Sequence, residues 1–281
     1  MSVNLFPERA TKTILADYND IESRIPGTYQ VFPETTINTK YNVFNSITDI
    51  TSPPPIAYYG VGIKGSYFLS DNGIQMAPYE PKPDELDMYF SIPLRLVPIS
   101  EDLSTAERAK YRMRVRQTYN GQSYWAYYLK CLENVDNSAR IVRVDPVSSA
   151  EIAYEFSTSQ LTPEPKKPTT SGVQDGSMTD VMVVKSVKAV VTGAEILEAI
   201  NVMFNGDMSY ARISEWGLYS GIDRVVESVL DGSGSTIRYT EACYCQLSYH
   251  LCNTGSTITG SSTNIERVFT FGNGKLLLQS A

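Results

Sequence analysis

The strongest constraint on the fold is a pair of strand-like segments joined by Asn120-Gly121. Arginines at 112, 114 and 116 alternate with Met113, Val115 and Gln117, which is the two-residue period of a β-strand. Asn-Gly is a preferred two-residue turn between antiparallel strands because both residues tolerate left-handed backbone angles. Residues 123–132 (SYWAYYLKCL) are apolar and aromatic and return as the second strand. The sequence therefore predicts a β-hairpin here.

Further strands are expected where β-branched and aromatic residues cluster. Residues 56–63 (IAYYGVGI) and 181–191 have this composition. Residues 90–98 (FSIPLRLVP) also predict a strand, which we place near a sheet edge because Pro93 cannot donate a hydrogen bond to a neighbouring strand.

Two short helices interrupt these strands. Ser104 to Glu107 forms a capping-box pattern that predicts a helix reaching about Lys110. Residues 194–204 (AEILEAINVMF) place their large apolar side chains on one helical face, and Gly206 follows as a stop.

Other stretches predict extended chain or loops. The first hundred residues are rich in Pro, Thr, Asn and Tyr, which favours short extended pieces, and Ser52–Pro55 predicts a rigid connector. Residues 77–85 predict a loop, and residues 157–180 contain almost no large apolar side chain. We therefore expect a mainly β (α+β) fold. It would be one antiparallel β-sandwich or barrel-like domain over residues 1–281, with one or two short helices and extended segments near 1–55 and 157–180.

The composition narrows the class of partner. The 19 tyrosines, against 9 phenylalanines and 2 tryptophans, suit strands and protein interfaces. A formal net charge of −7 argues against specific nucleic-acid binding, because an acidic protein gains nothing from counterion release. The charged N-terminal residues lack the apolar run of a targeting peptide, and nothing predicts a membrane span. We expect folding in a cytoplasm, where the four cysteines stay reduced.

The sequence contains one histidine, His250, which excludes any site that needs two. A catalytic triad would have to use His250, but no G-x-S-x-G turn accompanies it. Cys243, Cys245 and Cys252 lie close to His250, yet their spacing differs from the C-x₂₋₄-C of structural zinc sites. Strand alternation instead places Cys243 and Cys245 with Leu247 on a core face. We therefore predict no catalytic, cofactor-binding or metal-binding residue, and a protein that is not an enzyme.

Two other patterns have structural interpretations as well as functional ones. Arg112, Arg114 and Arg116 would form a positive ladder. The favoured interpretation is a solvated sheet face with local Glu or Asp partners, and the alternatives are contact with an acidic protein or with packaged DNA. The glycines of residues 60–65 (GVGIKG) lack the helix of a phosphate-binding loop, so they predict a bulge or close strand approach.

Three stretches resemble virion proteins of tailed bacteriophages. Residues 212–221 (RISEWGLYSG) resemble an I-S/N-E-x-G-L turn that recurs in baseplate, tail and neck components. Residues 55–65 (PIAYYGVGIKG) and 103–112 (LSTAERAKYR), with the following hairpin, are similar to phage structural proteins. The resemblance implies a subunit without an active site that forms part of a ring at the neck (head–tail connector) or baseplate. It would contact copies of itself and other virion proteins and would reach the virion after assembly in the host cytoplasm. An acidic ring could line a DNA channel.

Two alternatives remain open at this point. A carbohydrate-binding or host-adhesion module would use Trp125 and Trp216 to stack on sugars, whereas both tryptophans would otherwise pack in the core or an interface. A hydrolase with an unfamiliar site would depend on His250. We also expect residues 157–180 to protrude and contact another subunit, or to form a surface loop, because they offer almost nothing to bury.

Overall fold

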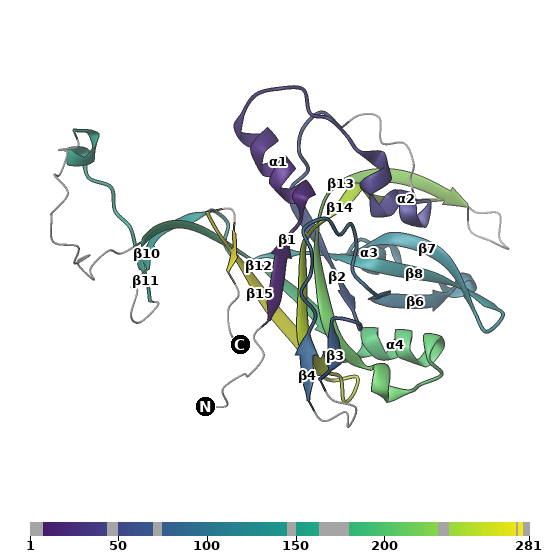
Figure 1. Ribbon diagram of the computed structural model, residues 1–281. Coiled ribbons are helices and arrows are strands. Elements are labelled where there is room, and N and C mark those ends of the chain that lie inside the picture. Colours follow the sequence, from purple (N-terminus) through teal and green to yellow (C-terminus); the bar gives the residue numbers. More distant parts are fainter. Residues whose placement is uncertain are drawn as a thin grey trace. The chain divides into compact units, whose positions relative to one another are not determined.

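The computed structural model describes residues 8–43, 50–69, 75–144, 150–162, 180–229, 236–273 and 275–277. It divides the chain into two compact units. Unit 1 comprises Met1–Glu133 and Lys188–Arg267, and unit 2 comprises Asn134–Val187 and Val268–Ala281. Antiparallel strands dominate both units (Figure 1), so the predicted mainly β fold with few short helices is confirmed.

One domain over residues 1–281 stays a prediction. The structure has two units, but strands β12 (Asp180–Thr192) and β15 (Asn264–Gly272) each contribute residues to both of them.

The main sheet of unit 1 has the order β1-β14-β13-β2-β8-β6, with β5 paired to β2 and β7 paired to β8. Its strands are β1 (Arg9–Lys12), β2 (Ile56–Gly62), β5 (Ser91–Ile92), β6 (Arg95–Pro98), β7 (Tyr111–Tyr119), β8 (Gln122–Cys131), β13 (Arg212–Val229) and β14 (Thr236–Thr257). A separate two-stranded sheet contains β3 (Ser66–Phe68) and β4 (Met76–Pro78). β14 lies between β1 and β13, and every residue from 241 to 253 on it is buried.

The predicted hairpin is confirmed as β7 and β8. Asn120 and Gly121 have φ values of 50° and 78°, the left-handed angles that this turn needs. β6, which follows Pro93, ends the path of the sheet, so the predicted edge position is also confirmed.

Both predicted helices are present as α3 (Thr105–Arg108) and α4 (Gly193–Met203). The Ser104 side chain accepts from the Glu107 N–H at the start of α3. Thr192 and Glu195 form a reciprocal capping box at the start of α4.

The extended chain expected before residue 55 is a wrong prediction for much of that region. It forms α1 (Ile14–Arg24), a short 3₁₀ turn at 33–35 and α2 (Ile37–Tyr41). Two further 3₁₀ turns occur later in the chain, at 99–101 and 208–210. The side chain of Thr13 caps α1, and the helix buries Leu15, Ala16 and Asn19. Burial of that narrow stripe outweighs the polar composition that suggested extended chain.

The second sheet has the order β11-β10-β12-β15-β16, with β9 paired to β12. Its further strands are β9 (Glu133–Asn134), β10 (Arg140–Val144), β11 (Glu151–Ala153) and β16 (Lys275–Leu277). In the expected protruding segment, a short 3₁₀ turn covers Thr158–Leu161, and its residues are exposed. Residues 163–179 lie outside the described residues, so contact of this segment with another subunit stays a prediction.

Among the residues that the structure describes, none of the helices combines the length and apolarity that crossing a bilayer requires.

Candidate functional site

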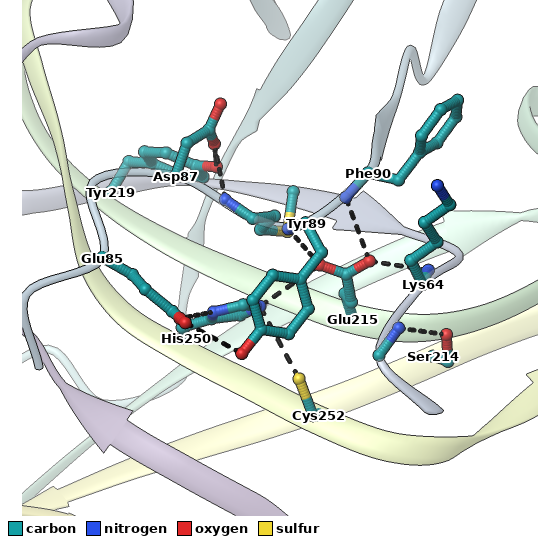
Figure 2. A network of polar contacts seen from close by, with 12 residues as sticks. Lys64, Glu85, Asp87, Tyr89, Phe90, Ser214, Glu215, Tyr219, His250 and Cys252 are labelled. Atoms are coloured by element: carbon teal, nitrogen blue, oxygen red, sulfur yellow. Dashed lines mark hydrogen bonds and ion pairs between the residues drawn. The ribbon is translucent and has the colours of Figure 1, made fainter. Parts of the chain in front are cut away.

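Glu215 is the centre of a buried polar network in unit 1 (Figure 2). Its carboxylate has no exposed surface and accepts hydrogen bonds from the backbone N–H groups of Lys64 at 2.6 Å, Tyr89 at 2.7 Å and Phe90 at 3.2 Å. A carboxylate with several N–H donors can replace the water that it loses on burial. Glu215 therefore ties two loop segments to strand β13. The "turn" expected at residues 212–221 is wrong, since β13 runs through this stretch.

His250 lies beside Glu215 on the neighbouring strand β14 and is also fully buried. Its Nδ1 is 3.0 Å from Oε2 of Glu85, and its Nε2 is 3.2 Å from Oε2 of Glu215. The hydroxyl of Tyr89 donates to Glu85 at 2.9 Å, and the Tyr89 ring packs edge-on against the imidazole. Both ring nitrogens of His250 therefore lie within hydrogen-bond distance of a carboxyl group. The imidazole is held between Glu85 and Glu215 inside unit 1.

Glycines allow the chain to approach this site closely. A Cβ atom at Gly65 would lie 2.0 Å from the backbone oxygen of Ser214, and one at Gly62 would lie 2.6 Å from the backbone oxygen of Phe90. The N–H of Gly65 also donates to the Ser214 hydroxyl at 2.9 Å. The predicted close strand approach in residues 60–65 is confirmed. Two of the stretches that carry the phage resemblance, 55–65 and 212–221, meet at this site.

The network holds a row of exposed tyrosines in place. The rings of Tyr67 and Tyr79 are 4.9 Å apart, and those of Tyr79 and Tyr89 are 5.7 Å apart. We call Tyr67, Tyr79 and Tyr89 the tyrosine patch; each is 38–44% exposed. Since Glu215 binds the backbone of Tyr89, one end of the patch is fixed to the sheet.

Unit 2 exposes an apolar sheet face of its own. Strand register places Ile152, Arg143 and Val181 directly opposite one another, and Ile141 opposite Val183. Ile152 is 59% exposed, Val181 44% and Val183 45%. We call these side chains the valine face: Ile141, Arg143, Ile152, Val181 and Val183. On the other face of the same sheet Val142 and Val184 are buried.

The arginines of β7 do not form the expected solvated ladder. Arg112 and Arg114 are buried, and only Arg116 is exposed. Local acidic partners were correctly expected: Arg112 binds Asp223 with two contacts of 2.7 Å, and Arg114 binds Asp102 at 2.7 Å.

Two observations explain the burial of these arginines. Met113 has a φ of 57°, and the N–H groups of residues 113 and 114 both donate to the buried carboxylate of Glu241. The first five residues of β7 are all buried, so the two faces of this strand are not divided into core and solvent. Burial raises the pKa of Asp223, but hydrogen bonds from Arg112 and Tyr58 outweigh it, and the pKa lies below its usual value.

The three cysteines of β14 pack in the core as free thiols. Cys243 and Cys245 are buried as predicted. Cys252 is buried too, because both faces of β14 are covered here and Tyr244 has a φ of 51°. Burial raises the pKa of the Cys245 and Cys252 thiols well above the usual range, so they stay protonated. In the described part of the chain, no group of three His, Cys, Asp or Glu side chains is placed to hold a metal ion.

Both tryptophans are buried, so the prediction that they pack in the interior is confirmed. Trp216 is 1% exposed and Trp125 is 8% exposed. Trp125 lines a cavity of about 410 Å³, but the guanidinium of Arg114 lies 3.4 Å from its ring centre. A sugar could not stack on that covered ring face without displacing Arg114.

The sequence did not reveal the Glu215 site. Its members lie far apart along the chain, and the carboxylate that binds Nδ1 of His250 comes from residues 77–85, which were expected to form only a loop. One usable signal exists: Glu215 is a charged residue within an apolar strand-like stretch (ISEWGL), and such a residue is rarely buried without partners.

Comparison with known proteins gives one family model that matches the chain. Searches of curated proteins and of solved structures gave no match. A family model described as a family of unknown function, DUF7208, matches residues 2–281. The chain therefore belongs to the DUF7208 family.

Proposed function

We propose that this chain is a structural subunit of a tailed-phage virion. It assembles with copies of itself and with other virion proteins, and it forms part of a ring at the neck or baseplate. This proposal extends the sequence resemblance, and its role is mechanical rather than catalytic.

The observation that carries the proposal is the apolar surface of unit 2. Besides the valine face, Phe156 is 72% exposed and Leu161 is 85% exposed. Single exposed apolar residues are ordinary on a protein surface, but a sheet face with several opposed β-branched residues is typical of a binding surface. In an assembly, a neighbouring subunit would cover this apolar face and remove it from water.

The buried polar groups of unit 1 also suit a structural role. Glu215 and His250 form hydrogen bonds with loops of the same chain and with each other. An active site instead keeps groups available for a substrate. The hydrogen bonds of the Glu215 site thus hold surface loops in one conformation, which a neighbouring subunit can bind.

The negative net charge of the chain favours one of the two proposed positions in the particle. At −7 the subunit repels DNA, so a ring of copies could line a DNA channel without gripping the duplex. This favours the neck. The adhesion alternative loses its two candidate residues, because Trp125 and Trp216 are buried.

Mass spectrometry of purified particles of the phage that encodes the chain tests the proposal. We expect the chain in the particle at several copies, comparable with other ring proteins. Its absence from particles that are complete and infectious would overturn the proposal. Crosslinking of intact particles, followed by peptide mapping, would then identify its neighbours at the neck or baseplate.

A further inference from the structure

We infer that copies of this chain join head to tail, with the valine face of one copy binding the tyrosine patch of the next. The inference rests on the proposed function and names the surfaces that it uses. It starts from two exposed apolar surfaces of different chemistry, one in each unit.

The valine face combines apolar side chains with positive charge. Arg143 lies between Ile152 and Val181 across the strands, and Lys185 shares its face by strand alternation. The acidic residue Glu151, next to Ile152 on β11, falls on the opposite face by the same rule. Two exposed cations, Arg143 and Lys185, therefore lie on the same side of the sheet as the exposed β-branched side chains of the valine face.

The tyrosine patch has the complementary composition. The loop that carries Tyr79 and Tyr89 contains four acidic residues and one lysine between positions 79 and 89. Among them Glu80 and Asp84 are exposed. Tyrosines are favoured at protein interfaces because a rigid ring buries apolar area while its hydroxyl stays hydrogen-bonded. The Glu215 network holds the backbone of Tyr89 in place beforehand, which lowers the entropy lost on binding.

A second copy of the chain is the partner that this pair of surfaces fits. Pairing two valine faces would bring Arg143 near its own counterpart, and pairing two tyrosine patches would bring acidic loops together; both arrangements are repulsive. Pairing the valine face of one copy with the tyrosine patch of another avoids both repulsions, because it brings opposite charges together. A contact between two different patches is heterologous, and such a contact builds a closed ring when the rotation between successive copies divides a full turn evenly.

Complementary blocking variants test the inference in the full-length chain. Val183→Asp places a charge on the valine face but leaves the tyrosine patch intact, and Tyr79→Lys does the reverse. We expect wild-type protein to self-associate in sedimentation velocity and each variant alone to weaken that association about 30-fold or more. A mixture of the two variants should form one-to-one dimers and nothing larger, because only one intact pair of surfaces remains.

Val225→Asp is the matched control, because Val225 is a 61%-exposed valine on β13 outside both surfaces. It should associate like wild type, and circular dichroism should show that all three variants are folded. Charge reversal gives a second test: Arg143→Glu should weaken association, and mixing it with Asp84→Lys should restore a contact that neither variant makes alone.

The outcomes separate this inference from the proposed function. If wild type associates and Tyr79→Lys associates equally well, the contact joins like surfaces and the inference is wrong. If wild type stays monomeric at every concentration although the particle contains the chain, another virion protein covers the valine face, and again only the inference fails. Absence of the chain from the particle overturns the proposed function itself.

Discussion

Glu215 and Ile152 both lie on antiparallel strands, but their surroundings are opposite. Glu215 is a carboxylate with no exposed surface, and it has hydrogen-bond donors from two loops and a histidine. Ile152 is an apolar side chain that is 59% exposed on a sheet whose other face buries Val142. Around Glu215 the buried polar groups of unit 1 have hydrogen-bond partners within the chain, whereas the valine face of unit 2 keeps apolar side chains exposed. We therefore expect variants of the Glu215 network to change stability and variants of the valine face to leave it almost unchanged.

The largest effect is expected from removing the Glu215 carboxylate. Glu215→Ala would leave three backbone N–H groups and the fully buried His250 ring without the Glu215 carboxylate as their partner, and we expect it to lower the free energy of unfolding by about 3–5 kcal/mol. Urea denaturation followed by fluorescence measures this. Glu227→Ala is the control on the same strand, since Glu227 is exposed and should change stability by less than about 0.5 kcal/mol. Equal stability of the two variants would show that the network does not stabilise unit 1.

A smaller loss is expected from closing the approach at Gly65. The added methyl group of Gly65→Ala meets the Ser214 backbone at 2.0 Å, so the segment around Gly65 must move away from β13 at a cost of about 2–3 kcal/mol. Gly260→Ala provides the comparison, because a Cβ there meets nothing within 4 Å. Thermal unfolding of both variants measures the difference. A Gly65→Ala protein with the Tm of the Gly260→Ala protein would contradict the close packing at this site.

The two faces of the unit 2 sheet can be compared by making the same change, valine to alanine, once on each face. Val142→Ala removes buried methyl groups and should cost about 1.5–2 kcal/mol, whereas Val183→Ala on the valine face should leave unfolding of the monomer almost unchanged. Chemical denaturation at low protein concentration measures both. A large loss for Val183→Ala under these conditions would mean that the valine face is already covered within the chain.

The smallest effect is expected on the loss of stability at low pH. The pKa of Asp223 is lowered in the folded protein, so its interaction with Arg112 stabilises fully above the unfolded pKa of about 4 and is lost as pH falls through the lower folded pKa. We expect Asp223→Asn to remove part of the stability lost between pH 5 and pH 2. The difference should stay below about 1 kcal/mol because the Asp223 side chain is 45% exposed. Denaturation curves at several pH values would show it, and identical curves for both proteins would refute it.

Local signals in the sequence predicted local structure well. Asn120-Gly121 and Thr192 act on their own neighbours, and the hairpin and α4 follow from them. α1 was missed because the tertiary burial of Leu15 and Ala16, rather than strong periodicity, stabilises it.

Residues that act at a distance were harder to predict. The burial of Arg114 depends on Asp102 and on packing against Trp125, and neither is evident from an alternating strand pattern. His250 was recognised as solitary, but its two carboxylate partners come together only after β13 and the loop before β5 have folded against β14.

The order of strands in unit 1 has a consequence for how the protein is made. β1 and β2 pair with β14 and β13, whose residues leave the ribosome last among these four strands. At about 5–20 residues per second, synthesis leaves the N-terminal strands without their partners for on the order of ten seconds. During that interval the apolar residues of β2 are available to other nascent chains, and the Glu215 carboxylate that will secure Lys64 does not yet exist. Chaperones that bind exposed apolar strands therefore have time to act on this chain before its central sheet closes.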